Sequence, residues 1–100
     1  MGNFIELIEL REFLVGAKSY CSIPDYMHEG ILDYVENHIE PGDFLRAVFE
    51  NRGFVDVVMR ADDFNKNLLY QYAHLCYNYI PRGCWGSKEA VDNWIKNKEE

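Results

Sequence analysis

Apolar residues recur at intervals of three and four along most of this chain, which is the spacing of one face of an α-helix. In the first segment they fall at positions 4, 7, 8, 10, 13 and 14, and we predict an amphipathic helix over residues 4–15. The strongest pattern runs from Asp63 to Tyr79, and Pro81 ends it. Five such helices without a convincing strand predict an all-α fold, a compact bundle of short helices.

Proline, glycine and capping residues set the other boundaries. Pro24 predicts the start of a second helix, which the sequence "IEPGD" ends. Asp43 caps a third helix that Gly53 closes, and Ser87 caps the last one. The segment 54–62, "FVDVVMRAD", is ambiguous, because its β-branched residues suit a strand while its neighbours are helices. We interpret it as a short helix or turn.

A length of 100 residues indicates a single domain, residues 1–100, with one hydrophobic core. Apolar residues make up 48% of the chain, so a folded protein is favoured over a disordered one. No apolar run reaches the roughly 18–20 residues that span a bilayer, and the N-terminus lacks the features of a signal peptide. Three cysteines without CxxC spacing suit reduced thiols. We therefore expect a soluble, cytoplasmic protein.

The formal net charge of −7 comes entirely from the first half of the chain. Residues 1–50 hold ten acidic and three basic side chains, whereas residues 51–100 hold seven of each. Binding to nucleic acid by phosphate neutralisation requires a basic surface, so this class of function is disfavoured. The same asymmetry permits a partner protein that is basic.

Acidic residues in one segment recur at intervals of four, four, three and four. On a single helix they would lie within about 80° of one another and form a line roughly 22 Å long on the solvent side. Like-charged neighbours cost a helix about 0.2–0.5 kcal/mol per pair. The line is either a solvated surface that keeps the protein soluble or a contact for a basic groove. We call these residues the acidic ridge: Asp25, Glu29, Asp33, Glu36 and Glu40.

Four motifs of the chain carry a family resemblance: "IPDYMHEGILDYV", "PGDFLRAVFEN", "RADDFNKNLLYQYAHLCYNYIP" and "CWGSKEAVDNW". Together they are similar to small uncharacterised proteins that bacteriophages and prophages encode, with the signatures IPxYMxxGI, PGxFLxAVxxN, ADxxN and CWGS. The resemblance covers residues 23–95, and residues 1–22 are a variable N-terminal helix and loop. It implies a viral or prophage context, and it carries no catalytic residue over to this chain.

In that context the acidic ridge predicts a non-enzymatic protein that inhibits or redirects a host protein. Nucleic-acid-handling and defence enzymes, such as restriction or CRISPR complexes, rank first as targets. Their DNA channels are basic, so a line of carboxylates can occupy them as a DNA mimic. The protein itself is expected to bind neither nucleic acid nor a membrane.

Aromatic residues suggest an alternative function. Tyr72 and Tyr79 are predicted to face the core, whereas Tyr70 and Tyr77, seven residues apart, share another helix face. Tyrosine is a favoured interface anchor, so this face predicts an accessory subunit or a homo-oligomeric interaction module. Core packing in an aromatic-rich domain is the plainer interpretation of the same residues.

A small metal-dependent hydrolase is the third hypothesis. Asp56, Asp62 and Asp63 could hold Mg²⁺ through their carboxylates, although a helix cap explains the Asp62–Asp63 pair better. His74 and Cys76 point to nearly opposite sides of a helix, which suits no shared metal. We therefore predict no catalytic residue, no metal ligand and no cofactor.

Overall fold

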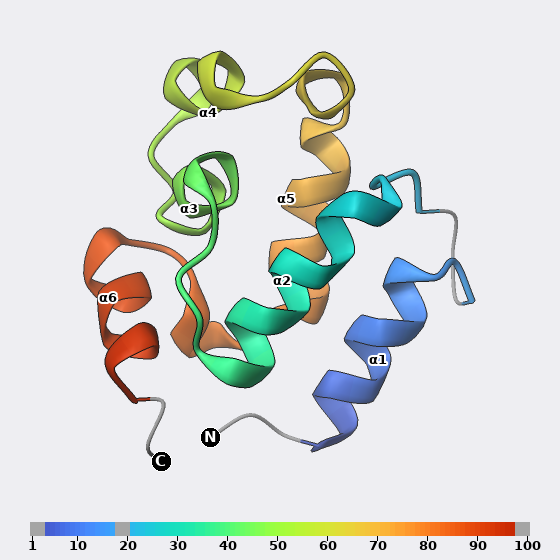
Figure 1. Ribbon diagram of the computed structural model, residues 1–100, viewed down its shortest axis with the longest axis vertical. Coiled ribbons are helices and arrows are strands. Elements are labelled where there is room, and N and C mark those ends of the chain that lie inside the picture. Colours follow the sequence, from blue (N-terminus) through green and yellow to red (C-terminus); the bar gives the residue numbers. More distant parts are fainter. Residues whose placement is uncertain (1–3, 18–20, 98–100) are drawn as a thin grey trace.

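Six α-helices form the computed structural model, which describes residues 4–17 and 21–97 (Figure 1). Two short 3₁₀ helices, η1 (Asn65–Asn67) and η2 (Arg82–Cys84), connect the later α-helices, and the described residues contain no strand. The predicted all-α class is therefore confirmed. The α-helices are α1 (Phe4–Leu14), α2 (Asp25–Asn37), α3 (Asp43–Phe49), α4 (Phe54–Arg60), α5 (Leu69–Tyr79) and α6 (Lys88–Lys96).

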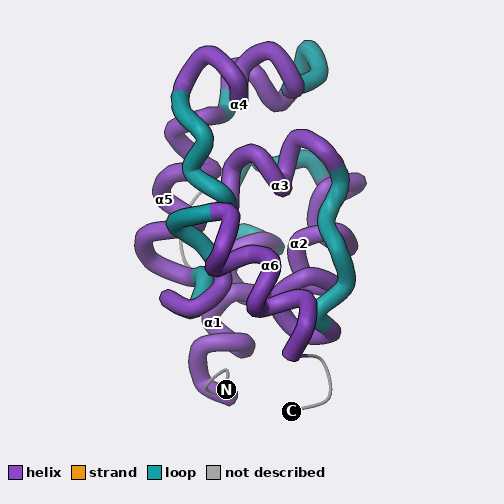
Figure 2. The backbone as a smooth tube through the Cα atoms, turned by 90° about the vertical axis from the view of Figure 1, so that its left-hand side faces the viewer, coloured by secondary structure: helices purple, strands orange, loops and turns teal. Residues whose placement is uncertain are grey.

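The helices pack as two groups around a shared core. Helix α1 packs against α2 and α5, whereas α3 packs against α4 and α6. Figures 1 and 2 both place α4 at one end of the molecule, with α1 and α6 toward the other. The loop predicted after the first helix lies partly outside the described residues, which omit 18–20. Over the described ranges, no helix is both long enough and apolar enough to cross a membrane.

Aromatic side chains fill much of the core, at positions that the helical spacing predicts. Phe13 of α1 stacks on Tyr79 of α5, with ring centroids 4.6 Å apart. Tyr34 of α2 stacks on Phe49 of α3, with centroids 4.9 Å apart. Tyr72 is 1% exposed, so its predicted inward orientation is confirmed. Ring pairs of this kind add about 0.5–1.5 kcal/mol beyond their buried area, and each pair joins two helices.

One helix end is capped as predicted and two are not. Asp43 is the first residue of α3 and does not cap it, since Gly42 is at the N-cap position and no side chain forms a cap hydrogen bond there. The Oγ atom of Ser87 accepts a hydrogen bond from the backbone N–H of Ala90 at 3.0 Å, which confirms the cap of α6. Helix α3 ends at Phe49, and Asn51 rather than Gly53 takes the left-handed conformation after it, with a φ of 57°. Gly53, with a φ of 116°, precedes α4 instead. The ambiguous segment is therefore a helix of its own.

The predicted helix over residues 63–79 is divided into two parts. Leu68, with a φ of −119°, separates η1 from α5. The carboxylate of Asp62 accepts hydrogen bonds from the backbone N–H groups of Phe64 at 3.1 Å and Asn65 at 2.8 Å. Asp62 therefore holds the turn that leads into η1, whereas α5, the long helix that it was predicted to cap, begins at Leu69 without a side-chain cap.

A buried carboxylate network joins α3 to α6. Glu50 is 5% exposed and accepts hydrogen bonds from Arg46 and Arg52, each at 2.6 Å. Arg46 also pairs with Asp92 of α6. Burial opposes ionisation of Glu50, but the two guanidinium groups outweigh it, and the pKa of this carboxyl lies below its ordinary value. The network therefore holds a charged group at the junction of the two helices.

Candidate binding groove

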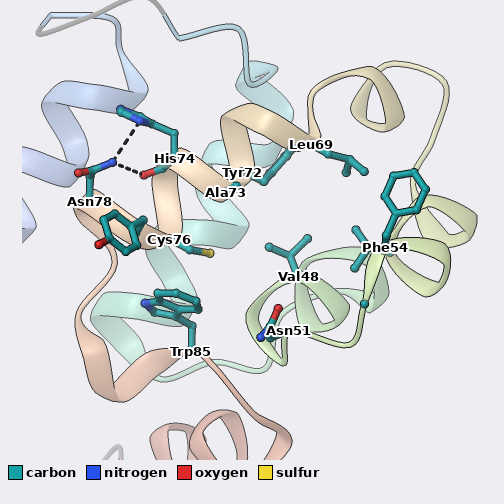
Figure 3. Close-up of a pocket in the computed structure, with 13 residues that line it drawn as sticks. Val48, Asn51, Phe54, Leu69, Tyr72, Ala73, His74, Cys76, Asn78 and Trp85 are labelled. Carbon is teal, nitrogen blue, oxygen red and sulfur yellow. Dashed lines mark hydrogen bonds between the residues drawn. The ribbon is translucent and has the colours of Figure 1, made fainter.

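An open groove of about 570 Å³ lies between α5 on one side and α3 and α4 on the other (Figure 3). In Figure 3, Trp85 and Leu69 stand toward opposite ends of the group of lining side chains. Most lining residues are apolar or aromatic, which is the usual composition of a binding site. They are Val48, Asn51, Gly53, Phe54, Val57, Leu69, Tyr72, Ala73, His74, Cys76, Tyr77, Asn78 and Trp85.

The α5 wall carries no formal charge. No Asp, Glu, Lys or Arg occurs from Asn67 to Pro81, in a chain where such residues make up 27%. Tyr70, Ala73 and Tyr77 are exposed at helical spacing, so they share one face. Tyr77 lines the groove and is 82% exposed, whereas Tyr70, 63% exposed, is not among the lining residues. The two predicted interface tyrosines share a face, and the structure brings Tyr77 to the groove.

Helix α4, on the opposite side, has no buried residue. Phe54, Val55 and Met59 are 75%, 70% and 76% exposed, and Val57 is half-buried along the groove. A seven-residue helix that used one face for the core would bury its apolar side chains. Exposed apolar surface of this kind marks interaction sites.

The backbone on both sides of Trp85 is held by the core. The hydroxyl of Tyr34 donates to the carbonyl of Cys84 at 2.6 Å. The backbone N–H of Gly86 donates to the carbonyl of Phe49 at 2.8 Å. These two hydrogen bonds fix the loop that places Trp85 at the groove, so this part of the site is preformed.

Few polar groups face the groove. Cys76 is 4% exposed, and burial raises its pKa to about 12, so its thiol is protonated at neutral pH. The amide nitrogen of Asn78 donates to the carbonyl of His74 at 3.1 Å, and it lies 3.1 Å from the Nδ1 atom of His74 (Figure 3). Both residues are exposed at the edge of the groove. The arrangement offers apolar contact area with hydrogen-bonding groups at its edge, rather than an activated nucleophile.

The acidic ridge is not the continuous line that the sequence predicts. Helix α2 ends at Asn37, and His38 takes the left-handed conformation, with a φ of 59°. Glu40 therefore lies beyond the helix, where it pairs with Arg46 at 3.3 Å. The prediction of a single helix face is wrong for Glu40, because the chain leaves the helix three residues earlier.

A second member of the ridge is neutralised by an arginine. Arg11 of α1 donates two hydrogen bonds to the carboxylate of Glu36, at 2.8 Å and 2.6 Å. Asp25 and Glu29 are exposed, and Asp33 is partly buried. In the described part of the chain, no lysine or arginine forms an ion pair with any of these three acids. The acidic surface of α2 is therefore limited to Asp25, Glu29 and Asp33.

The three aspartates of the hydrolase hypothesis have other partners. Asp56 accepts a hydrogen bond from Arg60 at 2.8 Å, and Asp62 accepts one from the hydroxyl of Tyr26 at 2.6 Å. Each hydrogen bond lowers the pKa of its carboxyl group. Among residues 4–17 and 21–97, no group of three or more His, Cys, Asp or Glu side chains could hold a metal ion. Asp63 pairs with Lys66 at 3.0 Å, and the structure does not bring these three aspartates together as the third hypothesis required.

The groove walls come from two segments that sequence reasoning did not connect. Tyr77 was predicted as an interface residue, whereas Val48, Phe54 and Val57 were not. A signal for them was present, since five of the seven residues of "FVDVVMR" are apolar, and the two charged ones, Asp56 and Arg60, lie four residues apart on one side of the helix. The apolar residues cover the rest of this short helix, which is more apolar surface than one contact with α3 buries.

Fold and site together define a small all-α domain with an uncharged binding groove. Comparison with protein-family models, with curated proteins and with solved structures finds no match to this chain.

Proposed function

We propose that this protein is a non-enzymatic interaction module whose groove binds the apolar face of a helix from a partner protein. The observation that supports the proposal is an exposed, uncharged surface on both sides of the groove, with Tyr77 on α5 and Phe54 on α4. Amphipathic helices bind in apolar grooves of this kind through residues at spacings of three and four. The partner inserts its apolar side chains between α4 and α5.

The area of the exposed rings determines how much binding free energy they can contribute. An aromatic side chain buries about 150–250 Å². Covering Tyr77 and Phe54, which are 82% and 75% exposed, removes roughly 310 Å² from water and contributes about 8 kcal/mol at about 25 cal/mol per Å². Association costs about 4–15 kcal/mol, so the two rings do little more than offset that cost. A stable complex also needs contacts with lining residues such as Leu69 and Trp85.

The test uses a synthetic helical peptide with leucines on one face and uncharged polar residues on the other. Amide chemical shifts measured by NMR should change in α4, in α5 and around Trp85. The affinity should hardly change between low and moderate salt, because apolar burial is not screened by ions. The absence of binding, or shifts confined to α2, would contradict the proposal.

Two matched variants make this test specific. Tyr77→Lys should weaken peptide binding about tenfold or more, because it places a charge where the peptide would be buried. Tyr26→Lys replaces another exposed tyrosine, on α2 and outside the groove, and should leave the affinity unchanged. An equal loss in both variants would mean that the groove is not the binding site.

A second candidate function uses the acidic surface of α2. Asp25, Glu29 and Asp33 would bind the basic channel of a nucleic-acid-handling host or defence enzyme, the class that the resemblance to phage and prophage proteins favours. The exposure of Asp25 and Glu29 without a lysine or arginine partner, within the described residues, supports this candidate. Its binding should weaken strongly as salt rises.

The test of this second candidate should change acids that have no lysine or arginine partner among the described residues. Glu36 is already paired with Arg11, so the double variant Asp25→Lys/Glu29→Lys is the appropriate change. Binding to a panel of purified bacterial DNA-binding enzymes should be lost in this variant and kept in Glu89→Lys, which changes an exposed acid on α6. Unchanged affinity in the double variant would refute the acidic surface as a contact.

A further inference from the structure

We infer that the partner at the groove is a second copy of this chain, in a dimer with twofold symmetry. This inference rests on the proposed function, because it names the occupant of the same groove. In a twofold interface the same surface of both copies meets, so that surface must be complementary to itself. The charge, the shape and the area of the groove face each bear on this requirement.

Charge favours a copy of the same chain over a basic partner. Each copy carries a net charge of −7, all of it from residues 1–50. The groove is lined by residues from 48 to 85, and the stretch 67–81 holds no formal charge. The α5 walls of two copies can therefore meet without bringing like charges together, and no acidic residue of α2 is among the lining residues. A basic partner would gain nothing from this face.

The shape of the face provides both a protrusion and a recess. Tyr77 and Phe54 stand 82% and 75% exposed beside a groove of about 570 Å³. Because the exposed rings and the groove belong to one face, a twofold axis through it brings the rings of each copy to the groove of the other. Tyr77 of one copy then packs against the apolar lining of the other, near Val57 and Leu69.

The exposed area is of the size that a dimer needs. At about 200 Å² per ring, the exposed fractions of Phe54, Tyr70 and Tyr77 amount to about 440 Å². A standard interface takes about 800 Å² from each partner. Three rings therefore supply about half of that area, before lining residues such as Val57 and Leu69 are added. A dimer of this size is expected to dissociate in the micromolar range.

Sedimentation equilibrium of the full chain, from about 1 to about 500 µM, tests the inference. The mass should rise from that of the monomer to twice that value. The dissociation constant should not increase with salt, because the contact is apolar and salt screens the repulsion between two acidic chains. Tyr77→Lys should raise the dissociation constant about tenfold or more, whereas Tyr26→Lys should leave it unchanged.

A further variant and the peptide separate the outcomes. Tyr70→Lys, on the same face of α5, gives a second measurement if circular dichroism shows that Tyr77→Lys has unfolded. A wild-type chain that stays monomeric over the whole range overturns the dimer, and so does a dimer that neither lysine variant weakens. If the monomer still binds the helical peptide in the groove, the proposed function stands without the dimer. If the chain binds neither a second copy nor the helical peptide, both the dimer and the proposed function are wrong.

Discussion

Replacing Tyr34 with phenylalanine tests whether the core holds the loop at the end of the groove. The Tyr34 side chain is fully buried, and its hydroxyl donates to the carbonyl of Cys84 at 2.6 Å. Phenylalanine would keep the ring stacked on Phe49 but remove this buried hydrogen bond. A hydrogen bond within a protein contributes about 0.5–1.5 kcal/mol, so the free energy of unfolding should fall by about that amount. The melting temperature should fall by roughly 4–8 °C for each kcal/mol in a domain of this size.

Urea unfolding followed by circular dichroism measures this change, and the slope with denaturant should stay constant. Tyr26→Phe is the matched control, because the Tyr26 hydroxyl donates to Asp62 at 2.6 Å on an exposed side chain where water can replace it. Tyr34→Phe should also weaken peptide binding, since Cys84 precedes Trp85 of the groove, while Tyr26→Phe should not. An equal loss of stability in both variants, or none in Tyr34→Phe, would refute the reasoning.

Glu50→Gln should remove an acid-sensitive part of the stability. The pKa of Glu50 is depressed below its ordinary value of 4.5, so its ion pairs stabilise the fold fully above that pH. This stabilisation is lost as the pH falls through the lower pKa of the folded state. The urea midpoints of the variant and the wild type should therefore converge in acid. Ser87→Ala should cost about 0.5–2 kcal/mol in urea unfolding and Ser87→Gly only a few tenths, unless the cap of α6 is dispensable. In the native protein, Ellman's reagent should label half-buried Cys21 faster than Cys76, whose pKa burial raises to about 12, and equal rates would contradict the burial of Cys76.

The helical spacing predicts the fold well where a helix buries one face. It fails where a hydrogen bond between distant residues determines which side chain is buried. Over residues 63–79 the apolar positions read as one continuous helix. Phe64, the first apolar position of this pattern, is 71% exposed, whereas Asn65 is 2% exposed. The reason is that the buried hydroxyl of Tyr72 donates to the side chain of Asn65 at 2.5 Å. This contact makes the asparagine a core residue, and the backbone breaks at Leu68 to allow it.

The candidate site was less predictable than the fold, because its charges are paired over long distances in sequence. Arg11 neutralises Glu36 from 25 residues away, and no local pattern shows that pair. The position of Tyr77 on an exposed face could be read from spacing alone. Its place on the same groove as Phe54 could not, since that depends on how α4 packs against α3 at the end of the molecule.

The groove face and the acidic surface of α2 could both be used by one protein, because the charged residues of α2 lie outside the uncharged groove. If the uncharged face joins two copies, the acidic side chains of each α2 remain outside the interface, and the dimer presents two acidic surfaces. A basic partner with two sites would then bind with higher avidity than a single α2 surface allows. Tyr77→Lys, which leaves every residue of α2 unchanged, would in that case weaken binding to such a partner as well. The acidic surface alone predicts no such effect, so this one variant distinguishes a coupled pair of surfaces from two independent ones.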